Sequence, residues 1–367
     1  MTAPFGCFFL PGPTEVLPEI LAAQVRPMIG HRGTATEALL GSVDAPLKAA
    51  FRTQNPVIIS TSSATGLMEA AIRNGVRRRV LCLVNGAFSQ RFADIAKACG
   101  TDHVVAEAPL GETFEADRVR DLIKETGADA VTVVHSESAT GALSPLGEIA
   151  AAVHEFPDVL LLVDAVTSLA GCPVETDGWG LDFVLTGSQK ALALPPGLAF
   201  GVASERLLAR AKTITGRGIY FDLLPYDAQA RKRQTPYTPA MSLLYALDAQ
   251  LRRIAATGGI EARWARHRAM RERVERWTRE KGEALGIAFL PREGRRSWTV
   301  SCHRLEAAAD GRTGGSVAKR MEARGFVIAA GYGKLKDSTF RIGHMGDHTV
   351  PELDALLAEL EQVLRRG

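Results

Sequence analysis

Two side chains able to carry out covalent or acid–base chemistry each follow an apolar segment near the middle of the chain. Asp164 lies in the run VLLLVDAV (159–166), and Lys190 stands in TGSQKALALPPG just after FVLTGS (183–188). A lone aspartate at such a place usually caps a helix, and most lysines are solvated surface charges. If the two apolar segments are neighbouring strands, both side chains lie beyond the strand ends, where ligands bind in open α/β sheets. The pair is therefore a candidate functional site.

An amine and a carboxylate that face one crevice match the needs of a pyridoxal phosphate enzyme. The amine condenses with the cofactor's aldehyde, and the carboxylate keeps the pyridine nitrogen protonated, so that the ring accepts electrons from a carbanion. The segment STSSATGLMEAAI (60–72) offers a place for the phosphate, because small hydroxyl residues lead into an expected helix. Backbone N–H groups of its first turn and the hydroxyls of Ser63 and Thr65 would bind the phosphate. Such runs also cap ordinary helices, so this segment alone is weak support.

Two further side chains could complete such a site. Phe88 in NGAFSQRFADIA follows the expected strand RVLCLV (79–84), where its ring could stack on a cofactor ring. Arg341 in TFRIGHMGD could hold a substrate carboxylate through two parallel hydrogen bonds, which a lysine cannot match. A buried core phenylalanine and an exposed strand arginine are the alternative interpretations of these residues.

The elements that must position these residues alternate regularly from residue 57 to about 205. Continuous apolar strands joined through helices are typical of a mostly parallel sheet covered on both faces. Apolar runs predict strands, and segments with helical periodicity between them predict helices. The expected strands are 56–60, 79–84, 103–108, 130–135, 159–166, 183–188 and 198–204, and the expected helices are 65–75, 88–100, 116–127 and 145–156.

The pattern changes from Pro239 onward. MSLLYALDAQLRRIAATGG and the charged segment 260–286 predict two long helices, and WTVSCHR, GFVIAAG and TFRIGH predict strands alternating with further helices. We therefore expect three parts: an N-terminal segment (1–20), a large cofactor-binding domain (21–245) and a smaller C-terminal α+β domain (246–367).

Composition and charge argue against several classes of protein. Hydrophobic residues make up 46% and charged residues 23% of the 367 residues, which is typical of a folded globular chain. The net charge of +3 is small, and the arginines between 263 and 276 alternate with glutamates, so nothing indicates a nucleic-acid partner. Five cysteines without CxxC spacing disfavour a disulfide framework or a metal site. Because we find no signal peptide and no membrane-span pattern, we expect a cytoplasmic protein with no membrane partner.

These features occur together in one known family. The segment from LLLVDAVTS to PPGLAF (160–200) resembles the core of class V aminotransferases, specifically the alanine/serine:glyoxylate (or pyruvate) group and its 2-aminoethylphosphonate relatives. LPGPTEVLP, PMIGHRG, SATGLMEAA, VNGAFSQR, HSESATGALSPL, YTPAMSLLYAL and FRIGHMGD follow in that family's order, so the resemblance covers nearly the whole chain. It implies an α/β architecture of pyridoxal phosphate fold type I, with a large, mostly parallel sheet domain and a smaller C-terminal α+β domain. It also implies a homodimer with active sites at the interface.

The resemblance assigns roles to residues by position. It implies that Lys190 bonds covalently to pyridoxal phosphate and moves the substrate's α-proton, and that Asp164 pairs with the pyridine nitrogen. Arg341 would bind the substrate carboxylate. The other implied contacts are Phe88 on one face of the ring and Val166 on the other, Ser63, Ala64, Thr65 and Gln189 at the phosphate, Ser138 near the phenolic oxygen, Thr238 at the phosphate of the neighbouring subunit, and His31 and Arg32 near the neighbouring site.

The implied reaction is a ping-pong transamination from a small amino acid, alanine or serine, to glyoxylate or pyruvate. A 2-aminoethylphosphonate:pyruvate transaminase is the alternative, in which Arg32 or Arg341 could contact the phosphonate. A cysteine desulfurase is disfavoured, because residues 303–367 contain no cysteine and Gln189 stands where such enzymes usually carry histidine. A protein that binds the cofactor without catalysis would be expected to lack Lys190 or Asp164. The phosphate segment has Ser-Ala-Thr-Gly where a second glycine is common, and Glu137 in HSES has no assigned role.

Overall fold

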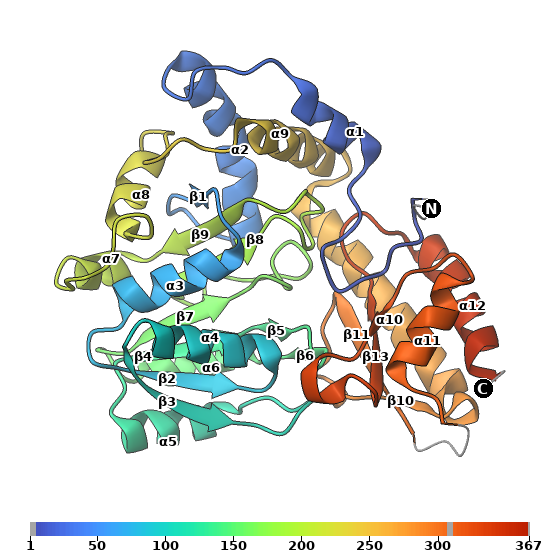
Figure 1. Cartoon of the computed structure of the whole chain (residues 1–367). Coiled ribbons are helices and arrows are strands. Elements are labelled where there is room, and N and C mark those ends of the chain that lie inside the picture. The colour runs from blue at the N-terminus through green and yellow to red at the C-terminus, as the bar shows by residue number, and fades with distance from the viewer. Residues whose placement is uncertain (1–4, 307–310, 366–367) are drawn as a thin grey trace.

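The computed structural model of the chain describes residues 5–306 and 311–365, and β-sheets organise it (Figure 1). The strands are β1 (Ile58–Ser60), β2 (Arg79–Val84), β3 (Asp102–Glu107), β4 (Ala130–Val134), β5 (Ser136–Glu137), β6 (Ala142–Leu143), β7 (Leu160–Asp164), β8 (Phe183–Gly187), β9 (Ala199–Ala203), β10 (Ile287–Phe289), β11 (Val300–Leu305), β12 (Ala329–Ala330) and β13 (Thr339–Gly343). Within these residues, seven strands form a large sheet in the order β1-β9-β8-β7-β4-β2-β3, and four form a small sheet in the order β10-β11-β13-β12. β5 and β6 pair as a separate ribbon.

Helices connect and cover these strands. The α-helices are α1 (Pro18–Ala22), α2 (Thr34–Phe51), α3 (Ala64–Gly75), α4 (Ala87–Ala98), α5 (Ala116–Thr126), α6 (Leu146–His154), α7 (Glu205–Ala211), α8 (Leu223–Ala230), α9 (Met241–Ala256), α10 (Gly259–Leu285), α11 (Gly314–Glu322) and α12 (Val350–Arg365), and the short 3₁₀ helices are η1 (Ala23–Val25) and η2 (Gly333–Leu335). In this part of the chain no helix combines the length and the apolar character that crossing a membrane requires.

The centre of the large sheet is parallel. β8, β7, β4, β2 and β3 run in the same direction, whereas β9 and β1 are antiparallel to their neighbours at one edge. β7 and β8 are direct neighbours, and Asp164 pairs in register with Leu185. The carboxyl ends of β7 and β8 therefore meet at one edge of the sheet, as the positions of Asp164 and Lys190 predict.

Alternate side chains of the central strands pack against two helical layers. Leu161 and Val163 of β7 belong to a buried cluster with α2, α5, α6 and α9, and Leu160 and Leu162 belong to another with α3, α4, α7 and α8. This two-sided burial explains why the strands are continuous apolar runs. Each such side chain contributes about 1.5–3 kcal/mol through burial.

The C-terminal sheet has its own buried cluster and lies beside the large sheet (Figure 1). Apolar side chains of α10, α11 and α12 pack on this sheet, and Phe9 of the N-terminal segment is buried among them. The same segment then reaches the end of β8, where the Thr14 N–H donates to the Gln189 carbonyl oxygen at 3.0 Å. The N-terminal segment thus connects the small sheet to the loop that carries Lys190.

The predicted fold class is confirmed: a mostly parallel sheet covered by helices is followed by a smaller α+β unit. The domain boundary proposed near residue 245 falls inside α9, whose Leu244 and Leu251 are buried in the large-sheet core. Helix α10 contributes Trp264 to that core and Met270 to the core of the small unit, so α10 physically joins the two.

Candidate active site

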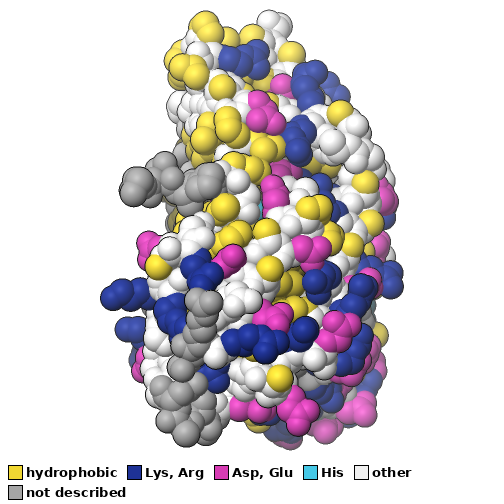
Figure 2. Space-filling view, turned by 90° about the vertical axis from the view of Figure 1, so that its right-hand side faces the viewer, with side chains coloured by type: hydrophobic (Ala, Val, Ile, Leu, Met, Phe, Trp, Pro, Cys, Tyr) yellow, Lys and Arg dark blue, Asp and Glu magenta, His cyan; other side chains and the backbone are white. Residues whose placement is uncertain are grey.

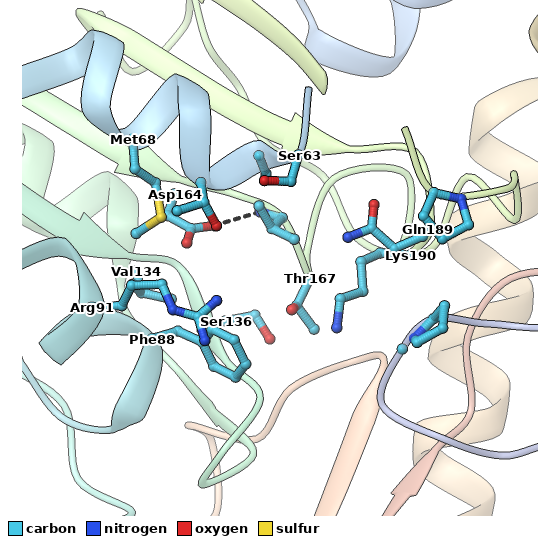
Figure 3. Close-up of a pocket in the computed structure, with 16 residues that line it drawn as sticks. Ser63, Met68, Phe88, Arg91, Val134, Ser136, Asp164, Thr167, Gln189 and Lys190 are labelled. Carbon is cyan, nitrogen blue, oxygen red and sulfur yellow. Dashed lines mark hydrogen bonds between the residues drawn. The ribbon is translucent and has the colours of Figure 1, made fainter. Parts of the chain in front are cut away.

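A cavity of about 320 Å³ opens at the carboxyl ends of β4, β7 and β8 (Figure 3). Asp164 and Lys190 both line it, and Figure 3 shows their side chains directed into the same space. Of the other predicted residues, those that also line it are Ser63, Ala64, Thr65, Phe88, Val166 and Gln189. Segments far apart in the sequence therefore converge on one site.

Asp164 ends β7 and is 4% exposed. The Val166 N–H donates to Oδ1 of Asp164 at 2.7 Å, which holds the carboxyl group at the cavity wall. Burial raises the pKa of Asp164 to about 7, and the Glu137 carboxylate adds to this rise, while the charges of Lys190 and Arg91 oppose it. Since burial makes the lone anion costly, a cationic N–H group in the cavity would be a favourable partner for it.

Lys190 is 8% exposed and follows β8. Burial lowers the pKa of its amine to about 8, and the charges of Arg341 and Arg91 act in the same direction, whereas Asp164 opposes them. The amine donates a hydrogen bond to the carbonyl oxygen of Pro11. A side chain at Gly12 would place its Cβ 2.4 Å from Nζ, and Gly12 has φ +119°, so the chain here requires glycine.

The lowered pKa of Lys190 predicts an unusual pH dependence of its reactivity. At pH 7 about a tenth of the Lys190 amines are neutral and nucleophilic, against about 0.03% for an ordinary lysine. Because the neutral fraction rises with pH, labelling of the cofactor-free chain with pyridoxal phosphate and borohydride should rise with a midpoint near pH 8 at Lys190. Peptide mass spectrometry reports Lys190 and the exposed Lys212 in the same samples, and their ratio removes the reagent's own pH dependence. A Lys190 that follows Lys212 at every pH would contradict this prediction.

The other end of the cavity is the start of α3. Ser63 is the N-cap residue, its side chain makes no capping hydrogen bond, and the helix begins at Ala64. The first N–H groups of an α-helix have no acceptor within the helix and carry partial positive charge, so an anion is favoured here. Gln189 lies beside them: a Cβ built at Gly187 would be 2.7 Å from Gln189 Oε1 and 3.4 Å from the Ala64 Cβ.

Phe88 is the second residue of α4, and its ring centroid lies 5.9 Å from Lys190 Nζ. The buried Glu137 holds this helix start in place. One carboxylate oxygen accepts from the N–H groups of Phe88 and Ser89, both at 3.0 Å, and the other accepts from the Ala139 N–H at 3.0 Å. Burial raises the pKa of Glu137, and these hydrogen bonds counteract the rise. The structure thus gives Glu137 a positioning role that sequence reasoning did not find.

Arg341 lies in β13 of the small sheet and is 7% exposed. Its Nε donates to the Ala330 carbonyl oxygen at 3.1 Å and its Nη1 to the Ser138 carbonyl oxygen at 3.0 Å. No carboxylate within residues 5–306 and 311–365 pairs with it, and burial lowers the pKa of its guanidinium. Arg341 is therefore a buried cation that still has N–H groups to donate.

Four predicted site residues do not line the cavity of this chain: Arg341, described above, and Ser138, Thr238 and Arg32. Ser138 is buried with its carbonyl oxygen on Arg341, because the chain turns after Glu137 (the Gly141 N–H donates to the Glu137 carbonyl oxygen at 2.8 Å), and Ser136 lines the cavity instead. Thr238 is exposed. Arg32 is exposed too, and its Nη2 donates to the Pro236 carbonyl oxygen at 3.2 Å. Arg32 and the segment with Thr238 thus lie together at the surface.

The cavity also contains residues that sequence reasoning missed. Arg91 lines it, with its guanidinium carbon 4.8 Å from the Phe88 ring centroid (Figure 3). The i,i+3 spacing of Phe88 and Arg91 on one helix could have revealed this pair. Gly12, in the motif LPGPTEVLP, was not assigned a role, although a glycine between two prolines indicates a special backbone conformation. Met68 and Thr167 are further wall residues with no pattern that points to them.

The donor set fits pyridoxal phosphate. A buried amine of lowered pKa, a buried carboxylate, a free helix start and an aromatic ring line one cavity at the strand ends, where an α/β fold binds ligands. Fold and site together define a pyridoxal phosphate-dependent enzyme.

Comparison with known proteins names the family. The chain belongs to the class-V aminotransferases, whose family description, "Aminotransferase class-V", matches residues 17–303. It is 39% identical to an uncharacterized aminotransferase of Methanocaldococcus jannaschii (97% of this chain, 92% of the relative) and 31% identical to the L-aspartate–glyoxylate aminotransferase of Paracoccus denitrificans (97% and 90%). The crystal structure of an alanine–glyoxylate aminotransferase from Nostoc sp. superposes with a TM-score of 0.89 at 31% identity, covering 100% of this chain and 97% of that one. The resemblance found in the sequence, including the cofactor and the fold type, is thereby confirmed.

Proposed function

We propose that this aminotransferase moves an amino group from a small amino acid, alanine or serine, to glyoxylate or pyruvate in a ping-pong reaction. The observation that carries the proposal is the buried Lys190 of lowered pKa facing Asp164 in one cavity. Relatives named for glyoxylate as a substrate support the acceptor. Bound pyridoxal phosphate supplies an aldehyde for the amino group and a ring that stabilises negative charge at the substrate α-carbon.

Each residue of the site has a role in this proposal. The neutral Nζ of Lys190 would take the proton from the substrate α-carbon and deliver it to C4′ of the cofactor. The Asp164 carboxylate would accept a hydrogen bond from the protonated ring nitrogen. Ser63, Ala64, Thr65 and Gln189 would bind the phosphate, and Phe88 and Val166 would orient the ring.

Arg341 binds the substrate carboxylate in this proposal, because it is a buried guanidinium with no carboxylate partner in the described chain. Replacing it with glutamine is expected to raise KM for L-alanine about 10- to 100-fold, the worth of a charge-assisted hydrogen bond. Arg341→Lys keeps the charge without the planar fork and should be intermediate. Steady-state kinetics at saturating cofactor measure both variants, and an unchanged KM in Arg341→Gln would locate carboxylate binding elsewhere.

The substrate assignment is tested by the half-reaction. Purified wild-type protein loaded with cofactor is mixed with L-alanine, L-serine, L-aspartate or 2-aminoethylphosphonate, and the loss of visible absorbance is followed. Fast bleaching by L-alanine or L-serine supports the proposal. Bleaching by L-aspartate alone would make the chain an aspartate enzyme, like the Paracoccus relative by its name.

A 2-aminoethylphosphonate transaminase is the second candidate, favoured by one observation. Arg91 lines the cavity and forms no ion pair within the described residues, so it is a cation in addition to Arg341 for a phosphonate dianion. Arg32, the other candidate, lies outside the cavity of its own chain. A bleaching response to the phosphonate alone would select this function.

We further propose a homodimer, in which Arg32 and Thr238 approach the neighbouring active site. Large exposed apolar side chains support an interface near Arg32 and Thr238, because Val25 is 85%, Met28 72% and Ile219 79% exposed. Figure 2 shows hydrophobic side chains gathered in the upper part of one face, whereas charges of both signs alternate in the lower part. The mass of the protein in solution, measured by light scattering, tests the dimer.

A cytoplasmic location remains a prediction.

A further inference from the structure

A second cavity of about 390 Å³ lies at the carboxyl ends of β2 and β3, at the same edge of the large sheet as the cofactor cavity. Its wall is mainly apolar and includes Ala87, Ala108, Pro109, Leu110, Ala139 and Leu335, with Gln90, Glu107, Thr140 and Lys334 as polar members. This cavity lies between the large unit and η2 of the small unit, because residues 332–335 form one side of it. Nothing in the reaction described above uses this space.

Two stacked rings separate the two cavities. Phe88 lines the cofactor cavity and Tyr332 lines the second one, with ring centroids 5.7 Å apart and planes at 29°. Ala87, the neighbour of Phe88, already belongs to the second cavity. The two cavities therefore meet at this ring pair, and Tyr332 forms its side toward the second cavity and toward Arg341.

The same rings lie between the groups that hold a substrate. The Phe88 centroid is 5.9 Å from Lys190 Nζ, and the Tyr332 centroid is 5.6 Å from the Arg341 guanidinium carbon. We expect an amino acid with its α-carboxylate on Arg341 and its α-carbon near Lys190 to pass close to both rings. Because the side chain branches from the α-carbon, a long side chain meets these rings.

The loop that carries Tyr332 is fixed by its backbone. A Cβ at Gly331 would lie 1.9 Å from the Leu335 carbonyl oxygen, and the Gly331 N–H donates to the Thr339 carbonyl oxygen at 2.8 Å. The Tyr332 ring itself is 42% exposed, and its hydroxyl makes no hydrogen bond to any described residue. Apart from its contacts with Phe88 and Arg341, the ring is exposed, so it can be removed with little effect on folding.

We propose that Tyr332 is a specificity-determining residue: its ring limits the substrate to small side chains, and the second cavity is the subsite that a longer, uncharged side chain occupies when the ring is absent. This inference rests on the proposed transaminase function and deepens it. The apolar wall selects the class of side chain, such as those of L-methionine and L-leucine.

The test compares L-methionine with L-alanine in wild type, Tyr332→Ala and Tyr332→Phe. In Tyr332→Ala the ratio of kcat/KM for L-methionine to that for L-alanine should rise at least about tenfold, the usual worth of relieved side-chain crowding. Tyr332→Phe keeps the ring and should keep the wild-type ratio within about twofold. Thermal unfolding of the three proteins confirms that folding is unchanged.

A second measurement does not depend on turnover. The dissociation constants of propanoate and 4-(methylthio)butanoate, the carboxylates that correspond to the two amino acids without their amino groups, are measured by calorimetry. Tyr332→Ala should bind 4-(methylthio)butanoate at least about tenfold more tightly than wild type does, and propanoate unchanged.

The outcomes separate this inference from the proposed function. Suppose that wild type transaminates L-alanine, and that Tyr332→Ala changes neither the kcat/KM ratio of L-methionine to L-alanine nor the dissociation constant of 4-(methylthio)butanoate. The role of Tyr332 is then refuted while the proposed function stands. If wild type transaminates neither L-alanine nor L-serine, the proposed function fails. The dissociation constants of propanoate and 4-(methylthio)butanoate then still show whether Tyr332 closes the second cavity. An equal gain in Tyr332→Phe would also refute the steric role.

Discussion

Replacing Lys190 with alanine is expected to abolish transamination, with a fall in kcat of about 10³-fold or more. The variant loses both the amine that condenses with the cofactor and the base that moves the α-proton. No other lysine of the described residues lines the cavity, so no neighbour can replace it. Turnover of L-alanine with glyoxylate measures the loss, and the visible absorbance of the dialysed protein shows whether the cofactor is still covalently held.

Two variants serve as controls for this experiment. Lys190→Arg keeps a positive charge but cannot condense with an aldehyde, so it should be as inactive as the alanine variant. Lys212→Ala removes an exposed lysine outside the cavity and should behave as wild type. Substantial turnover in Lys190→Ala, with a folded protein by thermal unfolding, would assign the chemistry to another group.

Replacing Asp164 with asparagine should lower kcat by about 10²- to 10³-fold and weaken cofactor binding, because a buried amide cannot neutralise a protonated ring nitrogen. The asparagine oxygen can still accept from the Val166 N–H, which now donates to Oδ1 at 2.7 Å, so the local backbone should persist. Equilibrium dialysis measures the cofactor affinity, and steady-state kinetics at saturating cofactor measure kcat. The exposed Asp158, changed to asparagine, is the matched control.

The stability of the cofactor-free chain distinguishes a lost function from a lost fold in Asp164→Asn. Burial raises the pKa of Asp164 to about 7, so the folded chain holds this proton more tightly than the unfolded chain does. Its contribution to the free energy of unfolding is therefore present at low pH and is lost as the pH rises from about 4 to about 7. Asparagine does not ionise, so at pH 8 the cofactor-free variant should unfold at a temperature at least as high as wild type. A clearly lower temperature would attribute the lost activity to misfolding.

The strands of the large sheet could be predicted because burial on both faces gives each strand a continuous apolar run in the sequence. β4 and β7 are wholly buried, and the sequence shows both as apolar runs of about the right length. The same apolar runs identified Lys190 and Asp164, since each of these residues directly follows or ends such a run. For them a local pattern and a general rule about strand ends were enough.

Other parts of the site left no such record. Glu137 stands in HSES like any acidic residue, and its role depends on α4, which is about 50 positions away in the sequence and in contact with it only in the fold. Ser138 was expected at the cofactor, but a turn after Glu137 places it outside the cavity, where its carbonyl oxygen accepts from Arg341. A hydrogen bond between distant segments has no periodicity that a reader of one sequence can detect.

The contrast has a physical origin. Amphipathic period, strand length and end-of-strand position are properties of neighbouring residues, so the order of the amino acids already specified the elements, the parallel sheet and the lysine–aspartate pair. The 5.7 Å stack of Phe88 on Tyr332, the fit of Gly12 against the Lys190 amine and the raised pKa of Asp164 depend on burial and on contacts between segments far apart in the chain. Those arise when the two sheets and the N-terminal segment pack together, and no sequence window spans that packing.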